Sequence, residues 1–354
     1  YVYNGSAWIT GVSTTPNDDT VTTAKIVDDA VTEAKIADAS VDEARLKISN
    51  SPTNGYALTA QSGNTGGLTW AAMSSGVSSD AQNNTVAGSG AGDSFSGTDA
   101  NGNALFGKDA GTAITTGDDN VGVGRASLEA LTTGSDNVAI GRSALAVCTT
   151  ADNNTAVGHH ALVANTTGTE NTAVGAYALD ALTTANNCTA VGKDSLTANT
   201  TGANNTAVGR RALYGNTTAS ENTSIGHNTL VANTTGANNT ACGRSALTNN
   251  TTASNNTAVG YYALDANTTG TENAAFGTIT LDANTTGSYN TGLGRSALGS
   301  NTTADNNTGV GYNALLLNTT GADNVAVGAV ALDASTTASE NTAVGYNAMG
   351  ATTT

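Results

Sequence analysis

Small apolar and polar residues follow one another in a pattern that repeats with a constant period from residue 107 to the end of the chain. The stretch NTAVGHHALVANTTGTE, residues 154–170, shows the 17-residue unit. A Gly that follows an apolar residue marks each of fifteen copies, and every step between successive copies has the same length. A loop change in one copy would break this register, so each copy is one structural unit stacked on the next. The array is therefore predicted to be a solenoid.

The unit is too short for a pair of helices, and it is rich in Thr, Val, Asn and Gly rather than in helix formers. One turn of a β-solenoid fits this length and composition. Equivalent residues then lie about 4.8 Å apart along the axis, so each column of the repeat becomes a ladder. We predict an all-β fold, a parallel β-solenoid of the β-roll or β-helix type with 17-residue coils.

The apolar columns predict which positions are buried. The columns of Val157 and Leu162 are the only steadily bulky ones, so we expect both to form buried stripes. The columns of Ala156 and Ala161 are small, which suits a thin coil or the close approach of a neighbouring chain. The Gly158 column is predicted to form a tight corner that a residue with a Cβ would resist.

Polar columns predict ladders between coils. The Asn154 column suits an amide ladder in which each side chain bonds to the next coil. A second Asn column, that of Asn165, leads an NTT triplet whose stacked Thr residues favour extended chain. Cys188 interrupts the first ladder, and Cys148 and Cys242 stand in other columns. The three Cys share no disulfide or ligand spacing, so we interpret them as substitutions within the array.

The chain before the array divides into four segments. Residues 1–20 read as a β-hairpin or the end of a preceding domain, and residues 51–80 as a connector and linker. Residues 21–50 hold a ten-residue repeat with little apolar surface of its own. Several chains side by side would bury its Val and Ile columns, which predicts a small trimerising segment. Residues 81–106 are expected to be irregular capping coils, and residues 107–354 the shaft.

Composition narrows the function. With 3 Phe and 2 Trp in 354 residues, the chain has too few large apolar side chains for an ordinary globular core. A net charge of −16 argues against nucleic acid as a partner, and no apolar run approaches the ~20 residues of a membrane helix. The first residue is Tyr and the last copy stops before its unit is finished. We expect the natural protein to extend beyond both ends.

Two stretches resemble known families. The segment VTTAKIVDDAVTEAKIADASVDEARLKISNSPTNGYALTAQSGNTGGLTWAAM, residues 21–73, resembles segments of tailed-bacteriophage tail fibres. The repeat NTAVGxxAL is similar to the head repeats of YadA-like trimeric autotransporter adhesins, which form left-handed parallel β-rolls in trimers. These resemblances imply a homotrimer. The 17-residue spacing and the NTT element depart from the adhesin pattern, so handedness and coil shape do not carry over.

Large side chains gather in the two columns after the repeat Gly. Beyond Lys47 every basic residue falls there. Arg and Tyr are favoured at recognition surfaces and stack on sugars, so we interpret these columns as a candidate recognition ridge. The alternative is that this corner faces solvent or meets acids of a neighbouring chain. The ridge consists of Arg125, Arg142, His159, His160, Tyr177, Lys193, Arg210, Arg211, His227, Arg244, Tyr261, Tyr262, Arg295, Tyr312 and Tyr346.

Candidate chemistry is sparse. Acidic residues concentrate in the column just before that of Asn154. Asn residues interrupt this column, which indicates that repulsion between like charges on neighbouring coils is kept low. No cofactor is predicted; calcium stays open because Asp and Asn oxygens suit it. His227 lies four coils from His159 and His160, which excludes a three-His metal site within one chain. No nucleophile elbow, phosphate loop or HExxH occurs, so we predict no enzyme. Carboxylate pairs between chains leave a glycan depolymerase as the weakest alternative.

These observations predict a homotrimeric structural fibre, the shaft of a phage tail fibre, with a solenoid about 70 Å long from fifteen coils. Expected partners are its own copies, other tail or fibre proteins at the N-terminal end, and a host surface glycan or protein. No nucleic acid and no membrane insertion are expected, and the location is the virion tail fibre. One alternative is a bacterial trimeric adhesin or other extracellular filament at the cell surface. Another is an ice-binding β-solenoid, which requires a flat, exposed Thr face.

Overall fold

The structure, a computed structural model, describes residues 2–3, 8–9, 56–60, 68–72, 77–95, 99–351 and 353. The chain divides into two compact units, Tyr1–Ser74 and Ser75–Thr354. All regular elements in the described ranges are β-strands, and none of those residues forms a helix that could cross a membrane. The trimerising segment predicted for residues 21–50 lies outside the described residues.

The first unit holds two antiparallel strand pairs. Strand β1 (Val2–Tyr3) pairs with β2 (Trp8–Ile9), so that Tyr3 lies opposite Trp8. Strand β3 (Tyr56–Ala60) pairs with β4 (Leu68–Ala72).

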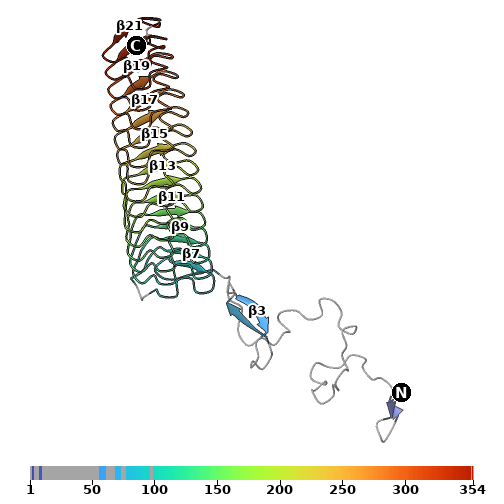
Figure 1. The fold of residues 1–354 in the computed structure, drawn as a ribbon. Coiled ribbons are helices and arrows are strands. Elements are labelled where there is room, and N and C mark those ends of the chain that lie inside the picture. Colours follow the sequence, from blue (N-terminus) through green and yellow to red (C-terminus); the bar gives the residue numbers. More distant parts are fainter. Residues whose placement is uncertain are drawn as a thin grey trace. The chain divides into compact units, whose positions relative to one another are not determined.

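The second unit is a stack of coils, seen as the tall column in Figure 1. At its N-terminal end, β5 (Ser78–Ser79) pairs antiparallel with β6 (Thr85–Ala87), and every later pair is parallel. Each coil then contributes one short strand. These strands are β7 (Ala104–Phe106), β8 (Val121–Val123), β9 (Val138–Ile140), β10 (Thr155–Val157), β11 (Thr172–Val174), β12 (Thr189–Val191), β13 (Thr206–Val208), β14 (Thr223–Ile225), β15 (Thr240–Cys242), β16 (Thr257–Val259), β17 (Ala274–Phe276), β18 (Thr291–Leu293), β19 (Thr308–Val310), β20 (Val325–Val327) and β21 (Thr342–Val344).

The register of this sheet follows the sequence period. Thr189 pairs with Thr206, and Val191 with Val208, each exactly one repeat unit further along the chain. Backbone bonds also join the coils outside the strands: the Leu196 amide donates to the Ala212 carbonyl at 3.0 Å. Because most of the coil is tied to its neighbours in this way, the backbone groups of a very thin fold find partners. The predicted parallel β-solenoid of 17-residue coils is confirmed.

Four residues with positive φ turn each coil. In the coil of β12 these are Asn187 (59°), Gly192 (132°), Asp194 (57°) and Leu196 (51°). Asn and Asp tolerate the left-handed region better than most residues, whereas Gly192 adopts a φ that essentially only Gly reaches. The predicted Gly corner is confirmed.

The core is narrow and holds small side chains. In the coil of β13, Ala207, Ala212 and Leu213 have no exposed surface, which confirms the buried Leu stripe. The predicted burial of the Val column is wrong, because Val208 is 36% exposed. Successive strand residues point to opposite faces, so when Ala207 points inward, Thr206 and Val208 point outward. Leu213 and the Ala columns already fill the space that a second branched column would need.

The Asn154 column forms the amide ladder that the sequence predicts, and the Asn165 column forms a second amide ladder. The backbone amide of Asn239 and its side-chain Nδ2 donate to Oδ1 of Asn222 in the preceding coil, at 3.0 and 3.2 Å. The second ladder links Asn216 Nδ2 to Asn199 Oδ1 at 2.9 Å. All four side chains are fully buried. Hydrogen-bonded amides therefore take up interior space that apolar side chains occupy in ordinary cores.

The expectation of extended chain at the NTT triplet is wrong. Thr200 and Thr201 lie in a bend, outside the strands. The amide of Thr200 and its hydroxyl both donate to the Thr217 carbonyl, at 2.8 and 3.0 Å. The NTT triplet is therefore held by bonds to the next coil from a bend rather than from a strand.

Candidate recognition ridge and outer sheet face

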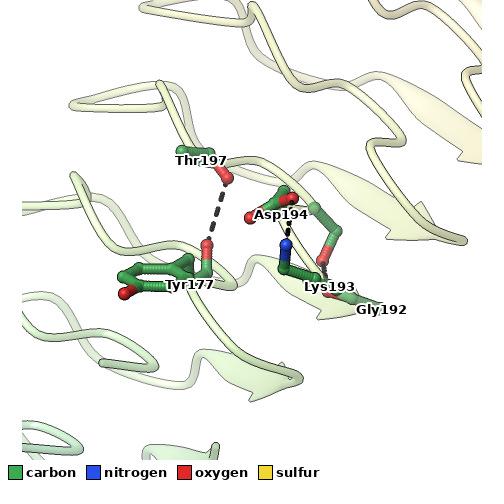
Figure 2. Close-up of polar contacts among 6 residues, drawn as sticks. Tyr177, Gly192, Lys193, Asp194 and Thr197 are labelled. Carbon is green, nitrogen blue, oxygen red and sulfur yellow. Dashed lines mark hydrogen bonds and ion pairs between the residues drawn. The ribbon is translucent and has the colours of Figure 1, made fainter. Parts of the chain in front are cut away.

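The predicted ridge residues lie along one edge of the solenoid sheet, directly after the strands. Residues of the first ridge column, such as Arg210, follow the corner Gly, and those of the second, such as Arg211, have left-handed backbone. The repeat places the ridge residues on successive or near-successive coils, so the array brings distant parts of the sequence together. Figure 2 shows this corner for two adjacent coils.

The corner is fixed by contacts between coils. The hydroxyl of Thr197 donates to the carbonyl of Tyr177 in the preceding coil at 3.1 Å. Lys193 Nζ lies 3.4 Å from Asp194 Oδ2, a partly exposed ion pair between neighbours in sequence. Such a pair contributes little to stability, so the backbone and the hydroxyl contacts hold the corner.

The densest part of the ridge spans three coils. Arg142 Nε donates to His159 Nε2 at 3.0 Å, and Arg142 Nη2 lies 3.3 Å from His160 Nε2. The ring of Tyr177 lies edge-on to His159 with centroids 5.1 Å apart. Partial burial, and then the charges of His159 and Arg142, lower the pKa of His160. A neutral imidazole is thus favoured at pH 7, as acceptance of an Arg hydrogen bond requires.

Other ridge members meet in pairs. The guanidinium of Arg244 lies 5.8 Å from the ring centroid of Tyr261, and that of Arg295 lies 5.9 Å from Tyr312, both within cation–π range. Arg211 stacks at 4.7 Å on Tyr214, which the sequence analysis did not include in the ridge. His227 is four coils from the His pair. Within the described part of the chain, no group of three or more His, Cys, Asp or Glu is placed to hold a metal ion.

Acids line the opposite edge of the sheet, just before the strands. Seven of them occupy this column, all exposed, and Asn fills most of its other positions. They are Asp119, Asp136, Glu170, Glu221, Glu272, Asp323 and Glu340. The sheet is therefore bordered by acids on one side and by bases on the other.

Between these two edges lies an apolar face that the sequence analysis missed, which we call the outer sheet face. It is formed by the outward residues of β7–β21, a Thr-rich column and the Val column. Val174, Val191 and Val327 are 36–37% exposed and Phe276 is 41% exposed. The signal was present in the Thr-Ala-Val strand, where period-two alternation allows Ala or Val to point inward, but not both.

Two half-buried acids stack on adjacent coils near the ridge. Burial raises the pKa of Asp265, and burial together with the charge of Asp265 raises the pKa of Asp282. Asp265 Oδ1 is buried without a hydrogen-bond partner. The folded state therefore prefers the protonated carboxyls, and it is progressively disfavoured as the pH rises through their raised pKa values.

The double variant Asp265→Asn, Asp282→Asn is expected to be more stable than the wild type at pH 7 and equally stable near pH 3, where the carboxyls are protonated in both states. Since both groups are partly exposed, the expected rise in Tm at pH 7 is small, on the order of 1–2 °C. Thermal unfolding followed by circular dichroism at the two pH values measures it. Glu272→Gln, which removes an exposed acid, is the control; an equal gain at both pH values would contradict the prediction.

Comparison of the chain with protein-family models, with curated proteins and with solved structures found no match. A function for the chain therefore rests on its residues and their geometry.

Proposed function

We propose that this chain is a structural fibre protein, the shaft of a homotrimeric phage tail fibre that holds an attachment element away from the virion. A bacterial trimeric adhesin or another extracellular filament is the alternative within the same structural class. The ridge would then contact a host-surface glycan or protein. The role is mechanical, and no reaction is assigned to any residue.

One observation carries this proposal: the parallel pairing of β7–β21 keeps a constant 17-residue register without an insertion. Enzymes and small-molecule binders usually place function in loops that differ from their neighbours. Here each coil repeats its predecessor, which yields a straight element of fixed thickness whose length is set by coil number. Fifteen coils at the sheet spacing give a shaft about 70 Å long.

Light scattering and electron microscopy of the purified chain test the proposal. The expected result is a particle with three times the 34.8 kDa mass of one chain, resistant to SDS without boiling, with a rod about 70 Å long. A stable monomer, or a compact particle without a rod, would overturn it. Secretion signals or a membrane anchor in the complete gene would favour the adhesin.

A second function class is favoured by one further observation. The second Thr of the NTT triplet, for example Thr201, Thr218 and Thr235, recurs outside the strands in coil after coil. A regular exposed hydroxyl ladder is what an ice-binding surface requires. Thermal hysteresis of the purified chain tests this role, and its absence at millimolar concentration would exclude it.

A further inference from the structure

The outer sheet face is large enough for a stable interface. It runs the length of the array, about 70 Å, and is about 13 Å wide across the strand and its corners, giving about 900 Å² per chain. A standard protein interface buries about 800 Å² per partner. One of its two outward columns is apolar, as shown by Val191 and Val208, each 36% exposed, and the other is rich in Thr.

The charged borders of the face determine which orientation of a partner copy is favourable. Basic residues occupy the column after the strands: Arg125 and Arg142, on consecutive coils, and Arg210 further along the array are all charged at neutral pH. Like charges stacked about 4.8 Å apart repel one another in an isolated chain. The acidic column before the strands, with Glu170 and Glu221, lies at the other border of the same face. A second charged column of opposite sign would relieve this repulsion.

A copy rotated about an axis parallel to the solenoid brings its acidic border to the basic border of the first copy, and the two apolar faces together. A copy with its axis reversed brings acid to acid and base to base. Parallel association is therefore the arrangement in which the face and both borders are complementary.

We propose that copies of this chain associate in parallel through the outer sheet face, with the basic border of one copy against the acidic border of the next. This inference deepens the homotrimer of the proposed function, on which it rests, by naming the surface and the orientation. It assigns the first ridge column, that of Arg210, to contacts between chains, which is the alternative that the sequence left open, so that only the second ridge column stays available for the host contact of the proposed function.

Cross-linking of a single Cys on the face tests this arrangement. Cys148 and Cys188 are buried, and Cys242 is itself on the face, so Cys242→Val removes the remaining partly exposed thiol. In that background Val327→Cys places one thiol in the fourteenth of the fifteen coils. Parallel copies hold the introduced thiols at the same height, whereas antiparallel copies separate them by about twelve coils, roughly 60 Å at the sheet spacing. The expected result is a covalent dimer with a short bis-maleimide.

A matched control places the thiol off the face. Thr320→Cys in the same Cys242→Val background lies on an exposed column in the adjacent coil. It is expected to cross-link at least tenfold less than Val327→Cys. Adding Val191→Asp and Val208→Asp, which bring like charges onto the face of every copy, is expected to reduce the Val327→Cys cross-link by a similar factor while the circular dichroism spectrum stays unchanged.

The possible outcomes separate the two proposals. A multimeric wild type in which Val327→Cys fails to cross-link, or cross-links no better than Thr320→Cys, overturns the interface and leaves the fibre standing. A wild type that light scattering shows to be a monomer overturns both. Preferential cross-linking at position 327 that is lost in the Asp variant supports parallel association through this face.

Discussion

Gly192→Ala is expected to cost at least about 3 kcal/mol of stability, from a strained backbone and a steric overlap together. Gly192 has φ 132°, a value that side chains with a Cβ rarely adopt. An added Cβ would lie 2.6 Å from the carbonyl oxygen of Gly209 and 2.7 Å from its carbon. Both are backbone atoms of the next coil, so neither can move without disturbing the stack. Thermal unfolding by circular dichroism, with hydrogen exchange of residues 188–226, measures the loss and its position.

Gly345→Ala is the matched control because it separates strain from overlap. Gly345 has a similar φ of 126°, but the nearest atom to an added Cβ is Ala348 Cβ at 4.0 Å. Its cost is expected to be strain alone, about 1–3 kcal/mol, and confined to the last coil. Equal losses in the two variants would show that contact between coils does not explain why this column is Gly.

Asn239→Ala is expected to have an effect of similar size, about 3 kcal/mol. The change removes the donor to the Ala253 carbonyl at 2.8 Å and the Oδ1 acceptor of the Asn256 amide at 3.0 Å. The Asn256 amide is then left unsatisfied in the interior, and an orphaned buried group costs roughly 1–3 kcal/mol. The Ala253 carbonyl keeps the bond from Asn250 Nδ2 at 2.9 Å. The loss of the bonds from Asn239 Nδ2 to Ala253 and to Asn222 Oδ1 therefore adds about 1 kcal/mol each. Urea unfolding at neutral pH measures the change in free energy. A loss below about 1 kcal/mol would indicate that water or local rearrangement replaces the ladder.

The chain carries a natural counterpart to this variant. At the equivalent position, the Cys188 thiol donates to the Gly202 carbonyl at 3.2 Å, and the Cys188 amide donates to Asn171 Oδ1 at 2.9 Å. A thiol offers the next coil no oxygen acceptor, and burial raises the pKa of Cys188 so that it stays protonated. Cys188→Asn is therefore expected to stabilise the array by about 1 kcal/mol, opposite in sign to Asn239→Ala. If Cys188→Asn instead lowered the free energy of unfolding, the interrupted Asn ladder would not be what weakens this coil.

Much of the array could be predicted because stacking converts sequence period directly into contacts. The Gly corner, the buried Leu stripe and the ladder of the Asn154 column can each be predicted from a single column, since each column contacts copies of itself in the neighbouring coils. The exposure of Val208 could not be predicted in that way. Which face of the strand points inward depends on the space that the other buried columns leave. Hydrophobicity alone would predict that Val208 is buried rather than Ala207.

The candidate site shows the same limit. Sequence placed Arg142, His159, His160 and Tyr177 on one edge, because the repeat fixes their columns. It did not include Tyr214, which belongs to another column, three residues after Arg211, and whose ring centroid lies 4.7 Å from the Arg211 guanidinium. The outer sheet face was missed for a related reason. Because the Val column was predicted to be buried, its residues could not be predicted to form a surface.

Because the register is constant, the number of coils alone sets the length of the shaft. Since each strand residue pairs with its equivalents in the neighbouring coils, removing one whole unit joins two surfaces that are already complementary, and every remaining contact is preserved. A deletion one residue shorter than the unit would instead set outward Thr against inward Ala and break every ladder at once. Gene copies of this unit can therefore be gained or lost in whole steps, each changing the reach of the molecule by about 4.8 Å. Length can evolve in such a protein without any change in fold.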